Sequence, residues 1–178
     1  ATIKIALDMY KEKLYSKHNA INKITPSHIN ELLLPMIDEN KIKNILPIGV
    51  GLPAGPGCAT GRVVFTPNEA EKHFQKGQDV ILIREETSPE DVHGMFASKA
   101  ILTSRGGMTS HAALVARGWG KCCIVGCNEL IINYKKREAQ INGHKIKHGD
   151  WITLNGSKGL IFKQKLSLIK PIIKENKL

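Results

Sequence analysis

Two different hydrophobic periodicities divide the chain near residue 45. In the first part, apolar residues recur at helical spacing and form one stripe, at Ile3, Leu7, Tyr10 and Leu14. Thr25-Pro26 is typical of the start of a second short helix, which Pro35 would end. From Ile48 onward, short apolar runs alternate with glycines and prolines, as strands and turns do. We therefore expect a helical connector over residues 1–45, a strand-rich domain over 46–163 and a lysine-rich linker over 164–178.

Within the expected domain, helix starts alternate with apolar runs. Thr66-Pro67-Asn68-Glu69 is a capping box with proline at the first helical position, and Ser88-Pro89-Glu90-Asp91 repeats the device. A third helix is expected over residues 110–117, with Gly118 as its end. The pattern also predicts a hairpin turn at Asn142-Gly143 and strands over residues 80–83, 100–102, 122–125, 151–154 and 160–162. This pattern alone predicts an α/β or α+β fold.

Composition and charge narrow the class of protein. The 178 residues carry a formal net charge of +10, which could suit a polyanion. However, the basic residues are scattered and form no recognised nucleic-acid module, so we expect a solvated basic surface and no nucleic-acid partner. No apolar run is long enough to span a bilayer, so we expect no membrane partner. The opening residues resemble neither a signal peptide nor a natural start, and we expect a piece of a larger protein.

The four cysteines do not have the spacing of a metal site. They stand at Cys58, Cys122, Cys123 and Cys127, without paired ligands two residues apart and without histidines in register. We therefore predict reduced core thiols and no metal ligands in this chain. This use of cysteine predicts a reducing environment, either the cytoplasm or an organelle that keeps thiols reduced, and not secretion.

One histidine stands at a predicted helix start behind two glycines. Gly106-Gly107-Met108-Thr109-Ser110-His111 follows the expected strand over 100–102 and precedes the helix over 110–117. Glycines let the backbone turn tightly and approach a ligand closely, and the first N–H groups of a helix have no partner within it. Together with the helix dipole, these groups favour an anion at this place. A phosphoryl group on the imidazole of His111 would lie in that cradle.

Other candidate motifs fit their families poorly. Gly49-Val50-Gly51-Leu52-Pro53-Ala54-Gly55 has the wrong glycine spacing for a dinucleotide fingerprint, and we interpret it as a structural turn. Gly118-Trp119-Gly120-Lys121 lacks the upstream glycine and the hydroxyl residue of a P-loop. The remaining histidines lie in polar or loop contexts and are expected at the surface: His18, His28, His73, His93, His144 and His148.

The histidine segment also resembles a known family. Gly106-Gly107-Met108-Thr109-Ser110-His111-Ala112-Ala113, continued by Val115 to Cys123, resembles the phosphohistidine segment of the pyruvate, phosphate dikinases. Related phosphoenolpyruvate-utilising enzymes usually have arginine where this chain has Met108, and they lack the Gly120-Lys121-Cys122-Cys123 continuation. The resemblance extends to residues 51–57, 86–91 and 149–152, with Gly55 where the family more often has serine. It implies a three-layer β/β/α swivelling phosphohistidine domain.

The resemblance assigns roles to residues. His111 would accept the β-phosphoryl group of ATP and pass it to pyruvate, giving phosphoenolpyruvate, AMP and pyrophosphate, or run the reaction in reverse. Thr109 would also be a regulatory phosphorylation position, and we place it at the helix cap, where its hydroxyl would bond an N–H of the first turn. The other residues expected to orient the ring or hold the phosphoryl group are Thr87, Arg105, Gly106, Gly107 and Ser110.

The chain is too short for the whole reaction. The resemblance implies that nucleotide-binding and phosphoenolpyruvate- or pyruvate-binding domains of the same polypeptide flank this one, and that they hold Mg²⁺. The fragment itself is expected to need no cofactor and to be inactive alone, and the full-length enzyme is expected to be a homo-oligomer. Two alternatives remain open at this point: the equivalent domain of a phosphoenolpyruvate synthase, and a stand-alone phosphohistidine carrier.

Overall fold

A computed structural model describes residues 2–25, 33–38, 42 and 44–169 of the chain. The chain divides into two compact units, of which the larger runs from Pro35 to Ile169. The predicted boundaries at residues 45 and 163 stay predictions. In the structure, the larger unit also includes strands β1 (Met36–Ile37) and β13 (Leu168–Ile169), which pair with each other in antiparallel fashion.

The smaller unit contains two helices in its described part, α1 (Thr2–Lys11) and α2 (Lys17–Asn22). Ser16 caps α2, because its hydroxyl accepts a hydrogen bond from the N–H of Asn19 at 3.2 Å. Ala6 and Ala20 are buried. The predicted helix near the N-terminus is therefore confirmed, but its stripe is not buried within the described chain: Leu7, Tyr10 and Leu14 are exposed, and Leu14 lies beyond the helix. The second predicted helix falls on residues 26–32, outside the described residues.

An eight-stranded sheet forms the centre of the larger unit, in the order β2-β12-β11-β4-β5-β6-β7-β3. Strands β4 to β7 are parallel to one another, and the outer strands are antiparallel to their neighbours. The eight strands are β2 (Gly49–Val50), β3 (Leu52–Gly55), β4 (Cys58–Val64), β5 (Val80–Arg84), β6 (Ala100–Thr103), β7 (Cys122–Val125), β11 (Trp151–Asn155) and β12 (Leu160–Phe162).

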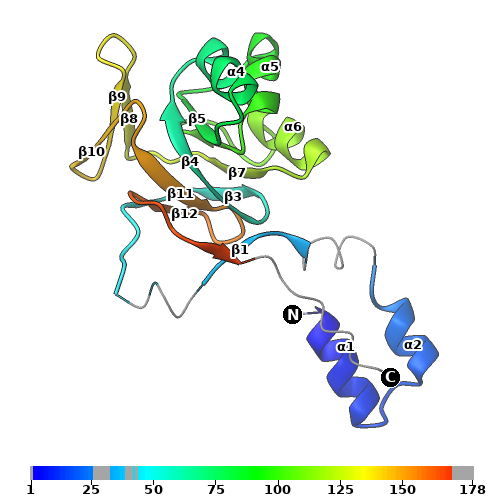
Figure 1. Cartoon of the computed structure of the whole chain (residues 1–178). Coiled ribbons are helices and arrows are strands. Elements are labelled where there is room, and N and C mark those ends of the chain that lie inside the picture. The colour runs from blue at the N-terminus through cyan, green and yellow to red at the C-terminus, as the bar shows by residue number, and fades with distance from the viewer. Residues whose placement is uncertain (1, 26–32, 39–41, 43, 170–178) are drawn as a thin grey trace. The chain divides into compact units, whose positions relative to one another are not determined.

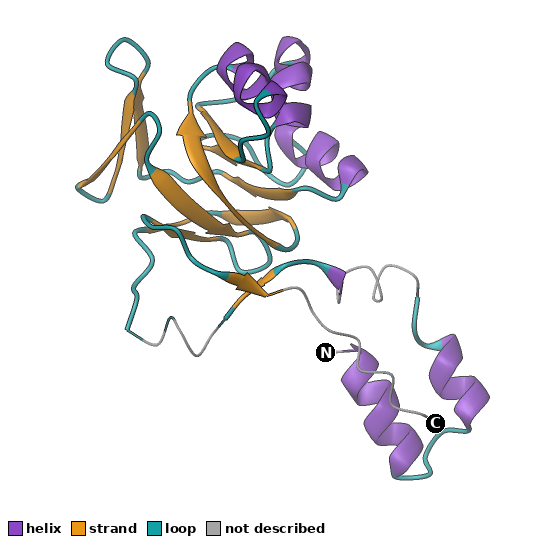
Figure 2. Ribbon diagram, in the orientation of Figure 1, coloured by secondary structure: helices purple, strands orange, loops and turns teal. Residues whose placement is uncertain are grey.

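Helices cover one face of this sheet and a second, smaller sheet covers the other (Figures 1 and 2). The helices are α4 (Pro67–Gln75), α5 (Val92–Ala97), which the short 3-10 helix η2 (Pro89–Asp91) precedes, and α6 (His111–Trp119). The second sheet has three antiparallel strands: β8 (Leu130–Asn133), β9 (Glu138–Ile141) and β10 (His144–Lys147). This arrangement is the predicted three-layer β/β/α fold.

Two apolar cores follow from strand alternation, because successive side chains of a strand point to opposite faces. Val64, Leu82 and Ile101 pack with Met95 and the alanines of α6 on the helical face. On the other face, their neighbours along the strands, such as Val63 and Ile81, pack against residues of β8, β9 and β10. Both faces of β5, β6 and β7 are thus covered over most of their length, which explains why these strands are mainly apolar runs.

Most predicted elements are confirmed, and three details are corrected. The capping box at Thr66 and Glu69 starts α4, and the Asn142-Gly143 turn joins β9 to β10 with positive φ angles of 47° and 81°. The third helix continues past Gly118 and ends at Gly120, whose φ of +63° is left-handed. Residues 49–55 form strands β2 and β3 instead of a turn. Of the histidines expected at the surface, His73 and His148 are only partly exposed, and the Nε2 atom of His148 is buried without a hydrogen bond. His28 lies outside the described residues.

Candidate functional site

The site lies at the start of helix α6, where a hydroxyl residue caps the first turn. Ser110 is the N-cap, with extended backbone, and its hydroxyl accepts a hydrogen bond from the N–H of Ala113 at 3.4 Å. The cap was expected at Thr109, so this detail of the prediction is wrong by one residue. Thr109 precedes the cap and is exposed. His111 therefore occupies the first helical position, next to the unpaired N–H groups of the helix start.

Glycines shape the loop that leads into α6. Gly106 has a φ of +102°, and a Cβ atom there would come within 2.9 Å of the Ser110 side chain. Gly126, from the loop after β7, packs so closely that a Cβ atom would lie 2.7 Å from the carbonyl oxygen of Gly106. A Cβ atom on Gly107 would meet nothing within 4 Å, so the loop is open on that side. The first glycine is required by the turn, and the second borders free space.

The ring of His111 is held through one of its two nitrogens. Its Nδ1 atom lies 3.1 Å from the hydroxyl of Thr87, which comes from the loop after β5 and is only 6% exposed. Nε2 of His111 makes no hydrogen bond with any residue that the structure describes. Because β5 and β6 are parallel neighbours, the loops at their carboxyl ends meet, which brings Thr87 to a histidine 24 residues away. The predicted pair of Thr87 and His111 thus lies together.

A shallow open depression surrounds the two side chains. It is lined by Glu86, Thr87, Thr103, Arg105, Ser110, His111 and Ala112. Arg105 is exposed, and its guanidinium forms no ion pair with any described residue. The pKa of the exposed Glu90 carboxyl is lowered from its ordinary value of 4.5. The main cause is a hydrogen bond from the Ser88 side chain, and a favourable charge interaction with His111 contributes. All predicted site residues except Gly107 and Thr109 line the depression or shape it.

Several residues that support the site were missed by the sequence analysis. Arg117 donates a hydrogen bond to the carbonyl oxygen of Met108 at 2.6 Å and so ties α6 back to its own loop. Arg84, at the end of β5, forms an ion pair with Asp91 at 3.2 Å. Tyr134, which follows β8 of the second sheet, accepts a hydrogen bond from the N–H of Glu85 in the loop after β5. Asp91 could have been found as the last residue of its capping box. Tyr134 contacts Glu85 across 49 residues, which leaves no local signal, and no sequence motif marks the contacts of Arg84 and Arg117.

The cysteines take no part in this chemistry. All four are free and buried, as predicted. Burial raises the pKa of the Cys123 thiol to about 12 and that of Cys127 to about 11, so both stay protonated near neutral pH. Cys123 lies behind α6, where its thiol is 3.9 Å from the carbonyl oxygen of Ala112. These thiols pack and do not react.

The described residues contain neither a metal-binding cluster nor a membrane-spanning helix. No three side chains among His, Cys, Asp and Glu of the described segments lie close enough together to hold a metal ion. No helix in the same segments has the length and apolar character that a membrane span requires.

Comparison with known proteins shows a similarity to one family of protein domains. Residues 76–159, which include the whole site, match the model of the PEP-utilising enzyme mobile domain. This part of the chain is therefore similar to the mobile domains of phosphoenolpyruvate-utilising enzymes. A solved structure of an Enzyme I protein, determined by NMR, aligns over 47% of this chain and 30% of its own, at 24% identity and a TM-score of 0.34.

The similarity to individual enzymes extends over nearly the whole chain. Pyruvate, phosphate dikinase 2 of Zea mays is 46% identical over 97% of this chain and 20% of its own length. The chloroplastic pyruvate, phosphate dikinase 1 of Arabidopsis thaliana is 47% identical over 96% of this chain and 18% of its own length. The chain thus spans about a fifth of the length of these relatives.

Proposed function

We propose that this chain is the phosphoryl-carrying domain of a pyruvate, phosphate dikinase and that His111 is the phosphoryl acceptor. The observation that carries the proposal is the arrangement of hydrogen bonds around the His111 ring at the start of α6. One ring nitrogen is bonded to Thr87, the other has no hydrogen-bond partner among the described residues, and the side chain lines a small depression beside unpaired helix N–H groups. The family match and the similarity to dikinases support the same assignment.

The contact with Thr87 occupies Nδ1 and leaves Nε2 as the ring nitrogen without a described partner. In the tautomer that carries the proton on Nδ1, this N–H donates a hydrogen bond to the Thr87 hydroxyl, and Nε2 keeps its lone pair. That lone pair attacks phosphorus, an N–P bond forms, and the bond between phosphorus and the donor's oxygen breaks, with the electron pair leaving on the donor. In the second transfer, the oxygen of the acceptor displaces Nε2 from phosphorus. The phosphoramidate suits a relay because a ring that carries a proton on Nδ1 leaves readily.

The loop and helix start provide for the charge of the phosphoryl group. The N–H groups of the first turn of α6 and the helix dipole stabilise an anion in front of Ser110 and His111. The guanidinium of Arg105 can form charge-assisted hydrogen bonds with phosphoryl oxygens, because no described carboxylate is paired with it. The absence of a Cβ atom on Gly107 keeps the approach open.

The complete reaction needs parts outside this chain. We propose that nucleotide-binding and pyruvate-binding domains of the same polypeptide supply and receive the phosphoryl group, in a homo-oligomeric enzyme. Mg²⁺ would belong to those domains, where it would neutralise phosphate charge. The described residues of this chain do not fit such an ion, because no three carboxylates or histidines gather among them. The buried free thiols favour a reducing compartment, which we propose to be the cytoplasm or a plastid-like organelle.

Thr109 is proposed as the regulatory phosphorylation position. Its side chain is exposed, it is not the cap of α6, and it stands two residues before His111. A phosphate there would add roughly 1.5 to 2 negative charges next to a site that must receive another anion. The structure of α6 does not depend on its hydroxyl, because Ser110 supplies the cap.

A labelling experiment tests the assignment of His111. The chain is expressed within the full-length enzyme and incubated with Mg²⁺ and phosphoenolpyruvate carrying labelled phosphorus. We expect an acid-labile, base-stable phosphate in the wild type and none in His111→Asn, because the asparagine amide can replace Nδ1 toward Thr87 but offers nothing in place of Nε2. The exposed His144 provides the matched control, His144→Asn, which should be labelled normally. Label retained by His111→Asn would overturn the assignment.

A further inference from the structure

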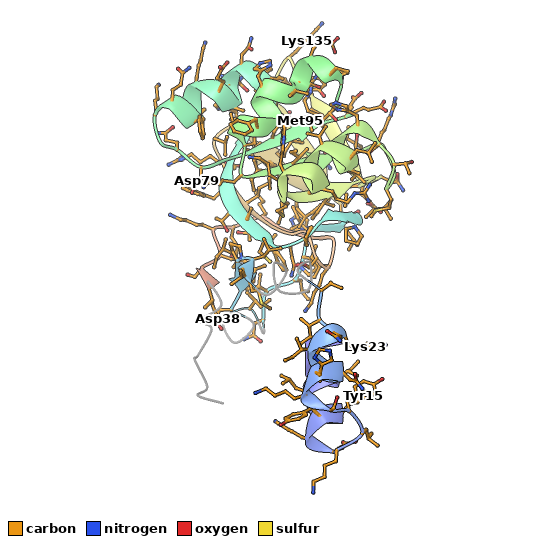
Figure 3. All side chains as sticks on the ribbon, turned by 90° about the vertical axis from the view of Figure 1, so that its right-hand side faces the viewer. Tyr15, Lys23, Asp38, Asp79, Met95 and Lys135 are labelled. Carbon is orange, nitrogen blue, oxygen red and sulfur yellow. The ribbon has the colours of Figure 1, made fainter. Side chains whose placement is uncertain are left out.

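The turn between β8 and β9 carries a tyrosine that reaches the site loop. Tyr134 follows β8, and its hydroxyl accepts a hydrogen bond from the backbone N–H of Glu85 at 3.0 Å. The turn closes on itself, because the N–H of Lys136 donates to the Asn133 side chain at 3.0 Å. Figure 3 shows Lys135, the next residue after Tyr134, at the outer edge of the domain. The tyrosine is therefore the residue of this turn that contacts the site loop.

The turn is anchored at two further points. The guanidinium carbon of Arg84 lies 5.4 Å from the centre of the Tyr134 ring, and the same guanidinium pairs with Asp91 at 3.2 Å. Arg137, at the end of the turn, forms an ion pair with Glu69 of α4. A turn that is fixed to two neighbouring elements can serve as a rigid support for the loop beside it.

The loop in question, residues 85–88, carries the threonine that bonds the catalytic histidine. Its backbone takes part in five hydrogen bonds. Two are donated by the loop, from Glu85 N–H to Tyr134 and from Ser88 N–H to Asp91 at 3.0 Å. Three are accepted by it, at the Glu85 carbonyl from Arg105 N–H at 2.8 Å and from the Ser104 hydroxyl at 3.3 Å, and at the Ser88 carbonyl from Asp91 N–H at 3.0 Å. Thr87 lies between these points and meets Nδ1 of His111 at 3.1 Å. The bond from Tyr134 is thus the one contribution of the second sheet to the position of Thr87 that these contacts include.

We propose that Tyr134 is a positioning residue for His111, acting through residues 85–88 and Thr87. This inference rests on the proposed function, in which Nε2 of His111 attacks phosphorus. The ring can do so only while Nδ1 holds the proton and points at the Thr87 hydroxyl. By fixing the N–H of Glu85, Tyr134 keeps the Thr87 hydroxyl within reach of Nδ1, where it can accept a hydrogen bond from the tautomer that leaves Nε2 free to react.

The test replaces only the hydroxyl. Tyr134→Phe keeps the ring beneath Arg84 and removes the acceptor for the N–H of Glu85. We expect hydrogen exchange of the Glu85 amide to accelerate while that of Ser88, which bonds Asp91, stays slow. The ¹⁵N NMR signals of His111 should move toward those of a mixture of tautomers. Phosphoryl transfer from phosphoenolpyruvate in the full-length enzyme should slow by roughly three- to tenfold, the range that one hydrogen bond supplies.

Tyr10→Phe is a matched control. Tyr10 is 40% exposed, close to the 38% of Tyr134, and its side chain makes no hydrogen bond within the described chain. That variant should leave all three measurements unchanged. The proposal is overturned if Tyr134→Phe, with its fold intact, retains wild-type ring signals and a wild-type transfer rate. The ring signals need no phosphoryl donor, so they test Tyr134 even if labelling of His111→Asn were to disprove the carrier function.

Discussion

Helices α4 and α6 cover the same face of the sheet but begin in different ways. At α4, the Glu69 carboxylate accepts hydrogen bonds from the N–H groups of Phe65 and Thr66, at 3.1 and 3.2 Å. The segment that leads into α5 does the same with Asp91. At α6 the first turn contains no acidic residue, and the position equivalent to Glu69 is Ala113, which is fully buried.

This difference separates a structural helix start from a functional one. Where the protein supplies its own carboxylate, the N–H groups and the dipole are already neutralised. Where it places an alanine in the core instead, these groups remain available for an anion from outside. Of these three helix starts, only that of α6 has a histidine at its first position, a preceding Gly106 with a φ of +102° and an arginine without an ion-pair partner among the described residues. In the function proposed above, the way in which a helix start is capped therefore distinguishes the one that receives phosphate.

The largest effect is expected when a carboxylate is introduced at the start of α6, as at the start of α4. Thr109→Asp places a carboxylate just before the Ser110 cap. At a separation of roughly 6 Å and an effective dielectric constant of about 20, its repulsion of a phosphoryl charge amounts to roughly 2–3 kcal/mol. We expect phosphoryl transfer through His111 to fall by about a hundredfold in the full-length enzyme, measured by rapid quench.

The uncharged variant Thr109→Asn isolates the charge, since it matches aspartate in shape. It should transfer phosphoryl groups at near the wild-type rate, as should Thr109→Ser. Equal rates for the Asp and Asn variants would show that the α6 site tolerates a carboxylate, and the electrostatic distinction between α4 and α6 would be lost.

A smaller effect is expected when the histidine of α6 loses its hydrogen-bond partner. Thr87→Val removes the hydroxyl that meets Nδ1 of His111 at 3.1 Å in a nearly buried position. Phosphoryl transfer should slow by roughly tenfold, because the ring is free to turn and to take the unreactive tautomer. Thr87→Ser restores a hydroxyl and should recover most of the rate. If the valine variant is as fast as the wild type, the Thr87 bond does not position the ring.

The sequence predicts these helix starts to different degrees. The capping boxes at residues 66–69 and 88–91 are local patterns, and both are present. The cap of α6 was placed one residue early because Thr109 and Ser110 are adjacent hydroxyl residues and either could serve. The backbone turn at Gly106 decides between them, and that turn depends on Gly126, which follows another strand. Likewise Gly118 and Gly120 could each end α6, and only Gly120 has the left-handed conformation.

The supporting contacts could not be predicted in the same way. Tyr134 bonds Glu85 across 49 residues, and this bond exists only because the second sheet packs on the first. The histidine itself was found because glycines, hydroxyls and helix start are contiguous in the sequence. The candidate site could therefore be predicted where its residues are adjacent in the sequence. Contacts that depend on the packing of the two sheets could not be predicted.

The two caps can also be compared by removing each hydroxyl. Thr66→Ala and Ser110→Ala should each lower the free energy of unfolding by about 1 kcal/mol, a typical value for an N-cap. Only Ser110→Ala should also slow phosphoryl transfer, by a fewfold, because it loosens the first turn next to His111. Unfolding can be followed by tryptophan fluorescence, since Trp119 and Trp151 both lie in the larger unit. A transfer defect in Thr66→Ala equal to that in Ser110→Ala would contradict the assignment of separate roles.

The smallest predicted effect concerns pH and the start of α4. Nε2 of His148 lies 3.6 Å from Glu69, with Arg137 and His73 also close to its ring. Burial is the main reason that the pKa of His148 is lowered from its ordinary value of 6.5, with contributions from Arg137 and His73 that Glu69 opposes. The unfolded chain therefore takes up this proton at a higher pH than the folded chain does. The stability contributed is complete above about pH 6.5 and is lost as the pH falls through the folded pKa.

The variant His148→Gln removes this titration and keeps a polar side chain beside Glu69. Between pH 7.5 and 5.5, the wild type should lose unfolding free energy relative to the variant, because only the wild-type unfolded chain takes up this proton. Denaturant unfolding followed by tryptophan fluorescence measures the difference. Glu69 titrates in a separate window: hydrogen bonds and nearby cations outweigh burial and lower its pKa from 4.5, so its contribution is lost only below that pH. Parallel stability curves for the wild type and His148→Gln from pH 7.5 to 5.5 would mean that His148 is not desolvated against the α4 cap, and that this helix start is less enclosed than its hydrogen bonds indicate.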